Sequence, residues 1–322
     1  MCSGPVENRV VITPRDRRKF LFACASFALA CRRSHPAQVS NERRVAITMD
    51  DPHTEDTPYC SVEERNRLML EQLAARRVQV MLFVCGKRID SARGAAVLSA
   101  FNDAGHFLAN HSYSHRNYND PASSSDALAP DIAQCEALIA HLPGFRRRFR
   151  FPFLKEGETL QKRDTLRDVL RARGYSNGHV TIDTSDWAYD SRLIARLKAE
   201  PAIDLEPFRA AYVAHMLDRA SYYDRLATTV TGYSIAHTLL LHHNLLNALF
   251  LGDVIDALER DGFRVIAPEK AFADPVFALQ PETIPAGESL VWALAHRDAL
   301  LRAGLRYPGE DDKYEAGALG RL

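Results

Sequence analysis

The sequence predicts an α/β protein built on parallel strands. Short runs rich in β-branched and aromatic residues alternate with runs whose apolar residues recur at helical spacing. Reactive side chains follow several of the β-rich runs, at the point where each predicted strand ends. Because parallel strands need long crossover connections, usually helices, this alternation suits either a barrel or a doubly wound sheet. In both architectures the carboxyl ends of the strands are where sites are built.

The strands are predicted from composition and from the residues that close them. The first run, RRVAITMDD at 43–51, ends in acidic residues, and the second, VQVMLFVCG at 78–86, is closed by Gly86. Strands are expected within seven runs: 43–51, 78–86, 106–115, 146–153, 179–187, 238–244 and 263–268. Helices are expected between them, two of which stop at Gly105 and Gly174. The helical runs are 61–77, 94–105, 131–142, 159–174 and 251–262.

Two further segments do not fit the simple alternation. Residues 188–232 are rich in helix formers and contain several tyrosines, so we expect an insertion that shapes one wall of the site. Residues 271–322 follow the last predicted strand. We expect them to form a loosely packed C-terminal extension to a main domain at 43–270.

Composition excludes several classes of protein. The 322 residues are 46% hydrophobic and 25% charged, as in a soluble globular protein. Lys and Arg number 41, as do Asp and Glu, and a net charge of zero argues against a nucleic-acid partner. No apolar run is long enough for a polytopic membrane protein.

The N-terminal segment 1–31 resembles an export signal. Arg17, Arg18 and Lys19 precede the uncharged apolar run 20–30, and the arginine pair resembles the twin-arginine signal of bacteria. Ala28-Leu29-Ala30 fits a signal-peptidase site, but the same residues before Cys31 resemble a degenerate lipobox. The protein is therefore expected to be exported, either into the periplasm or as a lipoprotein anchored to the membrane through Cys31.

Cysteine usage excludes one kind of metal site. Of the six cysteines, Cys60, Cys85 and Cys135 lie beyond the signal and Cys31, and none belongs to a C-x-x-C pair. A zinc site made of cysteines is therefore excluded by spacing. Export permits one disulfide among the three, but we expect reduced, partly buried thiols instead.

Reactive residues gather in five motifs at predicted strand ends. Each motif alone has an ordinary structural explanation: adjacent acids are often a solvated turn, and a histidine after leucines is often buried and satisfied. Taken together they supply carboxylates and imidazoles that can bind one metal and leave a position for water. Neutral imidazole and carboxylate ligands suit Zn²⁺, although other divalent metals fit them too. The motifs are TMDDP (48–52), NHSYSH (110–115), RFRFPF (148–153), DTSDW (183–187) and LLLHHN (239–244).

In this order the motifs TMDDP, HSYSH, RFPF, DTSDW and LLLH resemble those of the polysaccharide deacetylase family, the NodB-homology domain of carbohydrate esterase family 4. The resemblance covers residues 43–270. It implies a distorted (β/α) barrel of about seven parallel strands. It also implies a metal-dependent hydrolase that removes N-acetyl, less favourably O-acetyl, groups from an acetylated poly- or oligosaccharide.

The resemblance assigns a metal site and a base to particular residues. It implies that Asp51, His111 and His115 hold a divalent metal, most favourably Zn²⁺. Asp50 would be the general base that takes a proton from the metal-bound water. Arg150 would pair with Asp50 and keep it ionised.

The last two motifs supply the acid side of the site. The resemblance implies that His242 is the general acid that protonates the leaving amine, although His243 stays an alternative. Asp186 would orient His242, with Asp183 as the second choice. Trp187 would form part of the wall around the acetyl methyl group.

Two departures from the family pattern affect the first motif. Met49 and Pro52 stand where the family usually has Phe and Gly. The loop that carries Asp51 is therefore expected to have its own shape, which leaves the substrate open. A small non-sugar amide as substrate, and an inactive carbohydrate-binding protein, are the other readings. The oligomeric state leaves no trace in the sequence.

Overall fold

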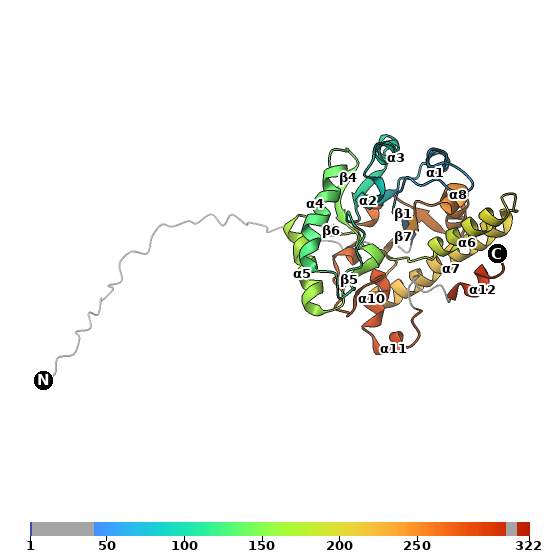
Figure 1. Cartoon of the computed structure of the whole chain (residues 1–322). Coiled ribbons are helices and arrows are strands. Elements are labelled where there is room, and N and C mark those ends of the chain that lie inside the picture. The colour runs from blue at the N-terminus through green and yellow to red at the C-terminus, as the bar shows by residue number, and fades with distance from the viewer. Residues whose placement is uncertain (2–41, 307–313) are drawn as a thin grey trace, which may run out of the picture. The chain divides into compact units, whose positions relative to one another are not determined.

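The computed structural model describes Met1 and residues 42–306 and 314–322. Apart from Met1, the predicted export signal at 1–31, including Cys31, lies outside the described residues. Within the described part, the strands are surrounded by helices (Figure 1). The main strands are β1 (Arg43–Asp50), β2 (Met81–Val84), β3 (Phe107–Asn110), β4 (Phe145–Phe149), β6 (Ser176–Asn177), β7 (Ala236–His242) and β8 (Phe263–Val265).

All pairings in this sheet are parallel, in the order β6-β4-β3-β2-β1-β7, with β8 also paired to β1. One edge of β1 is divided, because β8 pairs with Arg43–Val45 and β2 pairs with Thr48–Asp50. β7 pairs along the other edge of β1. The parallel strands confirm the α/β class and the distorted barrel expected from the sequence.

The segment after β6 brings the two ends of the sheet together. Asn177 pairs with Phe149 of β4, and a few residues later Ile182 forms a parallel bridge to Leu239 of β7. The backbone N–H of Leu240 donates to the carbonyl of Ile182 at 3.0 Å. The carboxyl ends of the strands thus converge on one region, where the reactive motifs lie.

Helices connect the strands and bury their apolar faces on them. The longer helices are α1 (Val62–Arg76), α3 (Ala92–Asp103), α4 (Leu128–Ile139), α5 (Leu160–Ala172), α6 (Asp186–Ala199), α7 (Glu206–Thr231) and α8 (Leu245–Arg260). The short ones are α2 (Gly86–Ile89), α9 (Pro268–Ala271), α10 (Leu290–His296), α11 (Ala299–Arg302) and α12 (Ala316–Leu319). β1 is buried from Val45 to Asp50, as expected of a parallel strand that is covered on both sides.

Two predicted strands end earlier than expected. The run 146–153 forms β4 only to Phe149, and a 3-10 turn begins at Pro152, which has no N–H to donate to a sheet. The run 179–187 contributes only the bridge at Ile182, and α6 begins at Asp186. The Asp, Thr and Ser residues before α6 favour the start of a helix over a strand.

The segment after residue 270 is packed more closely than the sequence suggested. Leu290, Val291, Trp292 and Ala293 of α10 belong to the main core cluster. A second sheet joins β5 (Lys155–Gly157) to β9 (Ala286–Gly287) in antiparallel pairing. The expectation of a loose extension is therefore wrong for these residues, because α10 covers apolar surface of the main domain. The boundaries of the domain, of the insertion at 188–232 and of the extension stay predictions.

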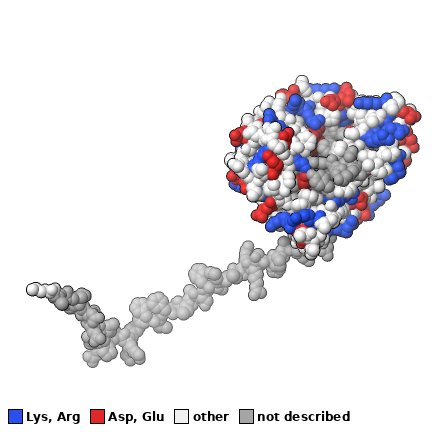
Figure 2. All heavy atoms as spheres, turned by 60° about the horizontal axis from the view of Figure 1, so that its bottom comes forward, with Lys and Arg blue, Asp and Glu red and all other residues white. Residues whose placement is uncertain are grey.

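The surface agrees with the balanced composition. Basic and acidic side chains are interspersed over the face shown in Figure 2. No helix among the described residues combines the length and apolar character needed to span a bilayer. Cys60, Cys85 and Cys135 are free thiols, the last two buried.

Candidate active site and metal centre

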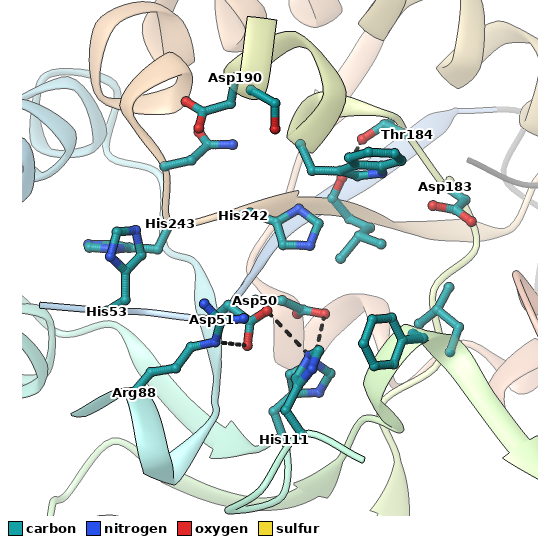
Figure 3. A pocket seen from close by; sticks show the side chains of 17 residues that line it. Asp50, Asp51, His53, Arg88, His111, Asp183, Thr184, Asp190, His242 and His243 are labelled. Carbon is teal, nitrogen blue, oxygen red and sulfur yellow. Dashed lines mark hydrogen bonds and ion pairs between the residues drawn. The ribbon is translucent and has the colours of Figure 1, made fainter. Parts of the chain in front are cut away.

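A pocket of about 690 Å³ opens where the strands end. Its lining brings together residues from all five sequence motifs (Figure 3). The predicted site residues that line it are Asp50, Asp51, His111, His115, Asp183, Trp187, His242 and His243. Two predicted site residues outside the lining are bonded to it: Arg150 lies directly behind Asp50, and Asp186 behind His242.

Asp51, His111 and His115 form a compact group of potential metal ligands. One ligand atom from each lies within 4.8 Å of the others. His115 Nε2 lies 3.3 Å from Asp51 Oδ2. Asp51 Oδ1 is buried and has no hydrogen bond among the described residues, only a long ion pair to Arg88 Nε at 3.4 Å. One carboxylate and two imidazoles fit a divalent ion such as Zn²⁺, and the unsatisfied oxygen is the kind of atom that an ion would satisfy.

Local backbone geometry positions these three side chains. Asp51 follows the last residue of β1 with φ at 57°, and Ser112 and His115 adopt φ of 65° and 56° in the loop after β3. These left-handed conformations are costly for residues with a side chain, and such strain is concentrated at functional sites. The Ser112 hydroxyl accepts a hydrogen bond from the His115 backbone N–H at 2.9 Å, which fixes the loop.

The protonation of the group suits metal binding. Burial lowers the pKa of His111 to about 4, so its imidazole is neutral near pH 7. His111 Nδ1 donates to the carbonyl of Arg150 at 2.8 Å, which leaves Nε2 as the potential ligand atom. Burial alone would raise the pKa of Asp51, but a hydrogen bond from His115 and nearby positive charges hold it well below its usual range. A neutral imidazole and an ionised carboxylate are the forms that bind metals.

Asp50 is held by a buried arginine. Arg150 Nη1 donates to Asp50 Oδ1 at 2.5 Å, and the two side chains are only 1% and 4% exposed. The remaining donors of Arg150 are used as well: Nη2 donates to the Thr48 hydroxyl at 2.9 Å and Nε to the Gly178 carbonyl at 2.8 Å. Asp50 Oδ2 lies 3.5 Å from His111 Nε2, on the side of the potential ligands.

His242 lies across the pocket from His111 (Figure 3) and is paired with Asp186. His242 Nδ1 donates to Asp186 Oδ1 at 2.7 Å, and its backbone N–H donates to Asp186 Oδ2 at 2.7 Å. Burial lowers the pKa of His242, but the charge and hydrogen bond of Asp186 outweigh it and raise the pKa to about 9. The pairing joins His242 to Asp186; Asp183, the second choice from the sequence, lies on another part of the pocket wall.

His243 has a different environment. Its Nε2 donates to Asn66 Oδ1 at 2.6 Å, and its ring contacts His53 and Phe101 edge to face. Burial lowers its pKa well below the usual range. His242 is the last residue of β7 and His243 follows it. Both line the pocket, but they have different hydrogen-bond partners.

Several residues that support the site were missed by sequence reasoning. Asn244 Nδ2 and Asn247 Nδ2 donate to Asp186 Oδ2 at 3.1 Å and 3.0 Å. Asn244 is also the N-cap of α8, and an Asn directly before an apolar helical run is a readable signal. Thr48, which binds Arg150, stands two residues before Asp50 and therefore on the same face of β1, which is also readable.

Comparison with known proteins finds a family match over part of the chain. Residues 37–177 match the polysaccharide deacetylase family. None of the curated proteins matches the chain significantly.

Three solved structures illustrate the similarity in fold. The chitin deacetylase of the fungal pathogen Colletotrichum lindemuthianum is 17% identical, with 78% of this chain and 93% of that chain covered and a TM-score of 0.51. A family 4 carbohydrate esterase from Streptomyces lividans is 19% identical over 72% of this chain and 97% of its own, with a TM-score of 0.46. A family 4 pseudoenzyme from Bacillus anthracis is 19% identical, with 72% of this chain and 66% of that chain covered and a TM-score of 0.49.

At these sequence identities the structural similarity supports only the fold. Of the three structures, the chitin deacetylase gives this support, because its TM-score is above 0.5. The family match adds the sequence evidence, since the matched segment holds three of the motifs, with Asp50, Asp51, His111, His115 and Arg150. The chain is thus similar to the polysaccharide deacetylase family through residues 37–177, less than half of its 322 residues.

Proposed function

We propose that this protein is a divalent-metal-dependent hydrolase that removes N-acetyl groups from a poly- or oligosaccharide. The observation that carries the proposal is the grouping of three potential ligands with two differently supported ionisable groups. Asp50 is paired with Arg150, and His242 is paired with Asp186. Because the Asp50 carboxylate and the His242 imidazole have different partners, one can act as a base and the other as an acid in the same reaction.

The potential metal ligands are Asp51, His111 and His115. Their donor set favours Zn²⁺ without excluding other divalent ions. When bound, such an ion would polarise the acetyl carbonyl and lower the pKa of a water. The three residues contribute by holding the ion in place, with His111 kept in one tautomer by the Arg150 carbonyl.

Asp50 is proposed as the general base. Its Oδ1 is committed to Arg150, whereas Oδ2 lies on the side of the potential ligands, 3.5 Å from His111 Nε2. Oδ2 is thus the oxygen that takes a proton from the attacking water. Arg150, with all three of its nitrogens hydrogen-bonded, keeps Asp50 from rotating away.

His242 is proposed as the general acid. Amide cleavage needs a proton on the departing amine, and an imidazole with a carboxylate partner supplies it. Because Nδ1 is bonded to Asp186, Nε2 is the atom that delivers the proton.

The proposed substrate is an N-acetylated sugar. Trp187 lines the pocket and would form the wall around the acetyl methyl group. Phe153 lines it too and is 47% exposed, as a ring platform for a sugar would be. The description of the Colletotrichum relative as a chitin deacetylase supports this class of substrate. We also propose export through the segment 1–31, with the mass of the mature N-terminus deciding between cleavage and lipid attachment at Cys31.

The test is acetate release from N-acetylglucosamine oligomers by the metal-stripped and the zinc-restored protein. We expect activity only with zinc, at one zinc per chain. His111→Ala should lose both zinc and activity. Asp50→Asn should keep zinc and lose roughly 10²-fold or more in kcat. His141→Ala, which changes an exposed histidine outside the pocket, is the matched control and should behave as the unmodified chain.

Other outcomes are informative. Activity that persists in Asp50→Asn would remove the assigned base. Zinc binding without acetate release would move the proposal to a small non-sugar amide or to an inactive carbohydrate-binding protein. Failure to bind any divalent metal would overturn the metal centre.

A further inference from the structure

The pocket carries one basic side chain that the proposed chemistry does not use. Among the lysines and arginines of the described residues, only Arg88 lines the pocket. It stands in α2, directly after β2, and its side chain is 44% exposed. The backbone N–H of Asp51 donates to the carbonyl of Phe83 in β2, which places the start of α2 beside the potential metal ligand.

Arg88 is paired less completely than Arg150. Its Nε lies 3.4 Å from Asp51 Oδ1, an ion pair that is too long for a strong charge-assisted hydrogen bond (Figure 3). Asp51 is its one carboxylate partner within the described chain. Arg150, by contrast, places three nitrogens within 2.9 Å of acceptors.

The carboxylate that Arg88 faces is also a ligand candidate. A cation held by Asp51 would draw on the same negative charge that now balances Arg88. The guanidinium has five N–H donors in a planar fork and cannot lose its charge near neutral pH. With Asp51 committed to an ion, an exposed arginine in the pocket is left to pair with an anion from outside, most favourably a carboxylate bound through two parallel hydrogen bonds.

The acidic side chains of the pocket do not occupy this place. Asp50 is bound to Arg150, and Asp190 Oδ1 accepts from the Leu246 backbone N–H at 2.9 Å, on the side of α8. Asp183 lies on the opposite side of the pocket from Arg88 (Figure 3). A negatively charged group beside Asp51 would therefore meet Arg88 first, the one arginine or lysine of the lining among the described residues.

We propose that the substrate of this pocket is an acidic N-acetylated saccharide whose carboxylate pairs with Arg88. The proposal rests on the proposed deacetylase function and deepens it. Because Arg88 contacts Asp51, the carboxylate must lie close to the acetamido group that is cleaved. Two arrangements meet this requirement: a carboxylate on the same sugar, as in N-acetylmuramic acid, or one on the neighbouring sugar, as in oligomers of N-acetylglucosamine and glucuronic acid.

The test uses the zinc-loaded full chain and pairs of substrates that differ in one charge. Each acid is compared with its methyl ester, and the measured quantity is the ratio of kcat/KM between the two. Because both substrates are measured with the same protein, an effect of a variant on zinc binding changes both values of kcat/KM equally and leaves their ratio unchanged. For one of the two pairs we expect a clear preference for the acid. Arg88→Gln should lower that ratio by roughly 10-fold to 100-fold, the range of a charge-assisted hydrogen-bonded pair.

Lys87→Gln is the matched control. Lys87 is the exposed basic neighbour of Arg88 in the same helix but does not line the pocket, so its loss should leave the ratio unchanged. The pair that responds to Arg88→Gln identifies which sugar carries the carboxylate. Equal rates on acid and ester, or an unchanged ratio in Arg88→Gln, would overturn the proposal while the deacetylase function stands.

Binding provides a readout that does not depend on turnover. If no substrate releases acetate, the proposed function fails, and calorimetry of the same acids and esters still decides the role of Arg88. Tighter binding of an acid than of its ester, lost in Arg88→Gln and kept in Lys87→Gln, would support the anion site. Equal affinities for acid and ester would refute it.

Discussion

Two adjacent histidines show how much a single position decides. His242 and His243 have the same chemistry, yet burial and partners move their pKa values in opposite directions. Asp186 causes the difference, because its two oxygens accept four hydrogen bonds, two of them from His242. His243 donates its hydrogen bond to a neutral amide, that of Asn66. The candidate acid is thus determined by a carboxylate 56 positions away in the sequence.

The pairing predicts a shift of the pH profile. A general acid must be protonated, so the rate should fall as pH rises through the pKa of His242, about 9 without a bound ion. Asp186→Asn removes the charge that raises this pKa, and the alkaline limb should move to lower pH. Above pH 8 we expect a loss of about 10-fold or more in kcat. Asp183→Asn is the control, and a limb that moves equally in both variants would contradict the assignment.

The buried pair of Asp50 and Arg150 predicts an effect on stability. Arg150→Met leaves an unpaired carboxylate at a position with almost no exposure, which should lower the free energy of unfolding by about 3–5 kcal/mol. The double variant Asp50→Leu/Arg150→Met removes both charges and should be more stable than the single one. Urea unfolding measures both, and a double variant that is the less stable of the two would refute this account.

At the scale of elements, the site depends on where strands stop. Asp50 ends β1, His111 follows β3, Arg150 follows β4 and His242 ends β7. Parallel pairing brings these ends to one edge although they are far apart in sequence. The backbone then leaves the strand geometry at once, with Asp51 in the left-handed region. The strand ends bring the reactive groups together, and the backbone conformation of the following loops sets the direction of their side chains.

The packing of α10 predicts a contrast between two leucines. Leu290 is 1% exposed in the main core, whereas Leu300 of α11 is 90% exposed. Leu290→Ala should cost about 2–5 kcal/mol of unfolding free energy, from lost burial and the cavity left behind. Leu300→Ala should change it by less than about 0.5 kcal/mol. Equal, small effects would mean that the segment after residue 270 is peripheral to the core.

At the scale of the whole molecule, buried histidines make the fold sensitive to acid. Burial lowers the pKa of His106 to about 4 and that of His215 to about 3. Both rings accept a hydrogen bond from a backbone N–H, His106 from Val80 and His215 from Ser185, which a protonated ring could not do. In the unfolded chain each binds a proton below about pH 6.5.

Stability should therefore be lost as pH falls from about 6.5 towards 4, because the unfolded state takes up protons that the folded state excludes. Each group contributes at most about 1.4 kcal/mol per pH unit. Urea unfolding at pH 7.5 and pH 5 measures the loss. His106→Gln should show a smaller difference between the two pH values, and an unchanged difference would exclude His106 as a cause.

The sequence by itself determined the class of fold and the set of reactive residues. The spacing of apolar residues, every two residues in a strand and every 3.6 in a helix, is a local property of the chain. Parallel strands must then bring their carboxyl ends to one edge of the sheet. Thr48 and Asn244 were readable by the same local rules, although they were missed.

Only the tertiary structure decided the choices that depend on contacts between distant segments. His242 and His243 both line the pocket, and only the position of Asp186 makes His242 the candidate acid. The same holds for the burial of α10 and for Arg88 beside Asp51. Each is set by side-chain packing and charge across the fold, for which the local sequence carries no period or spacing.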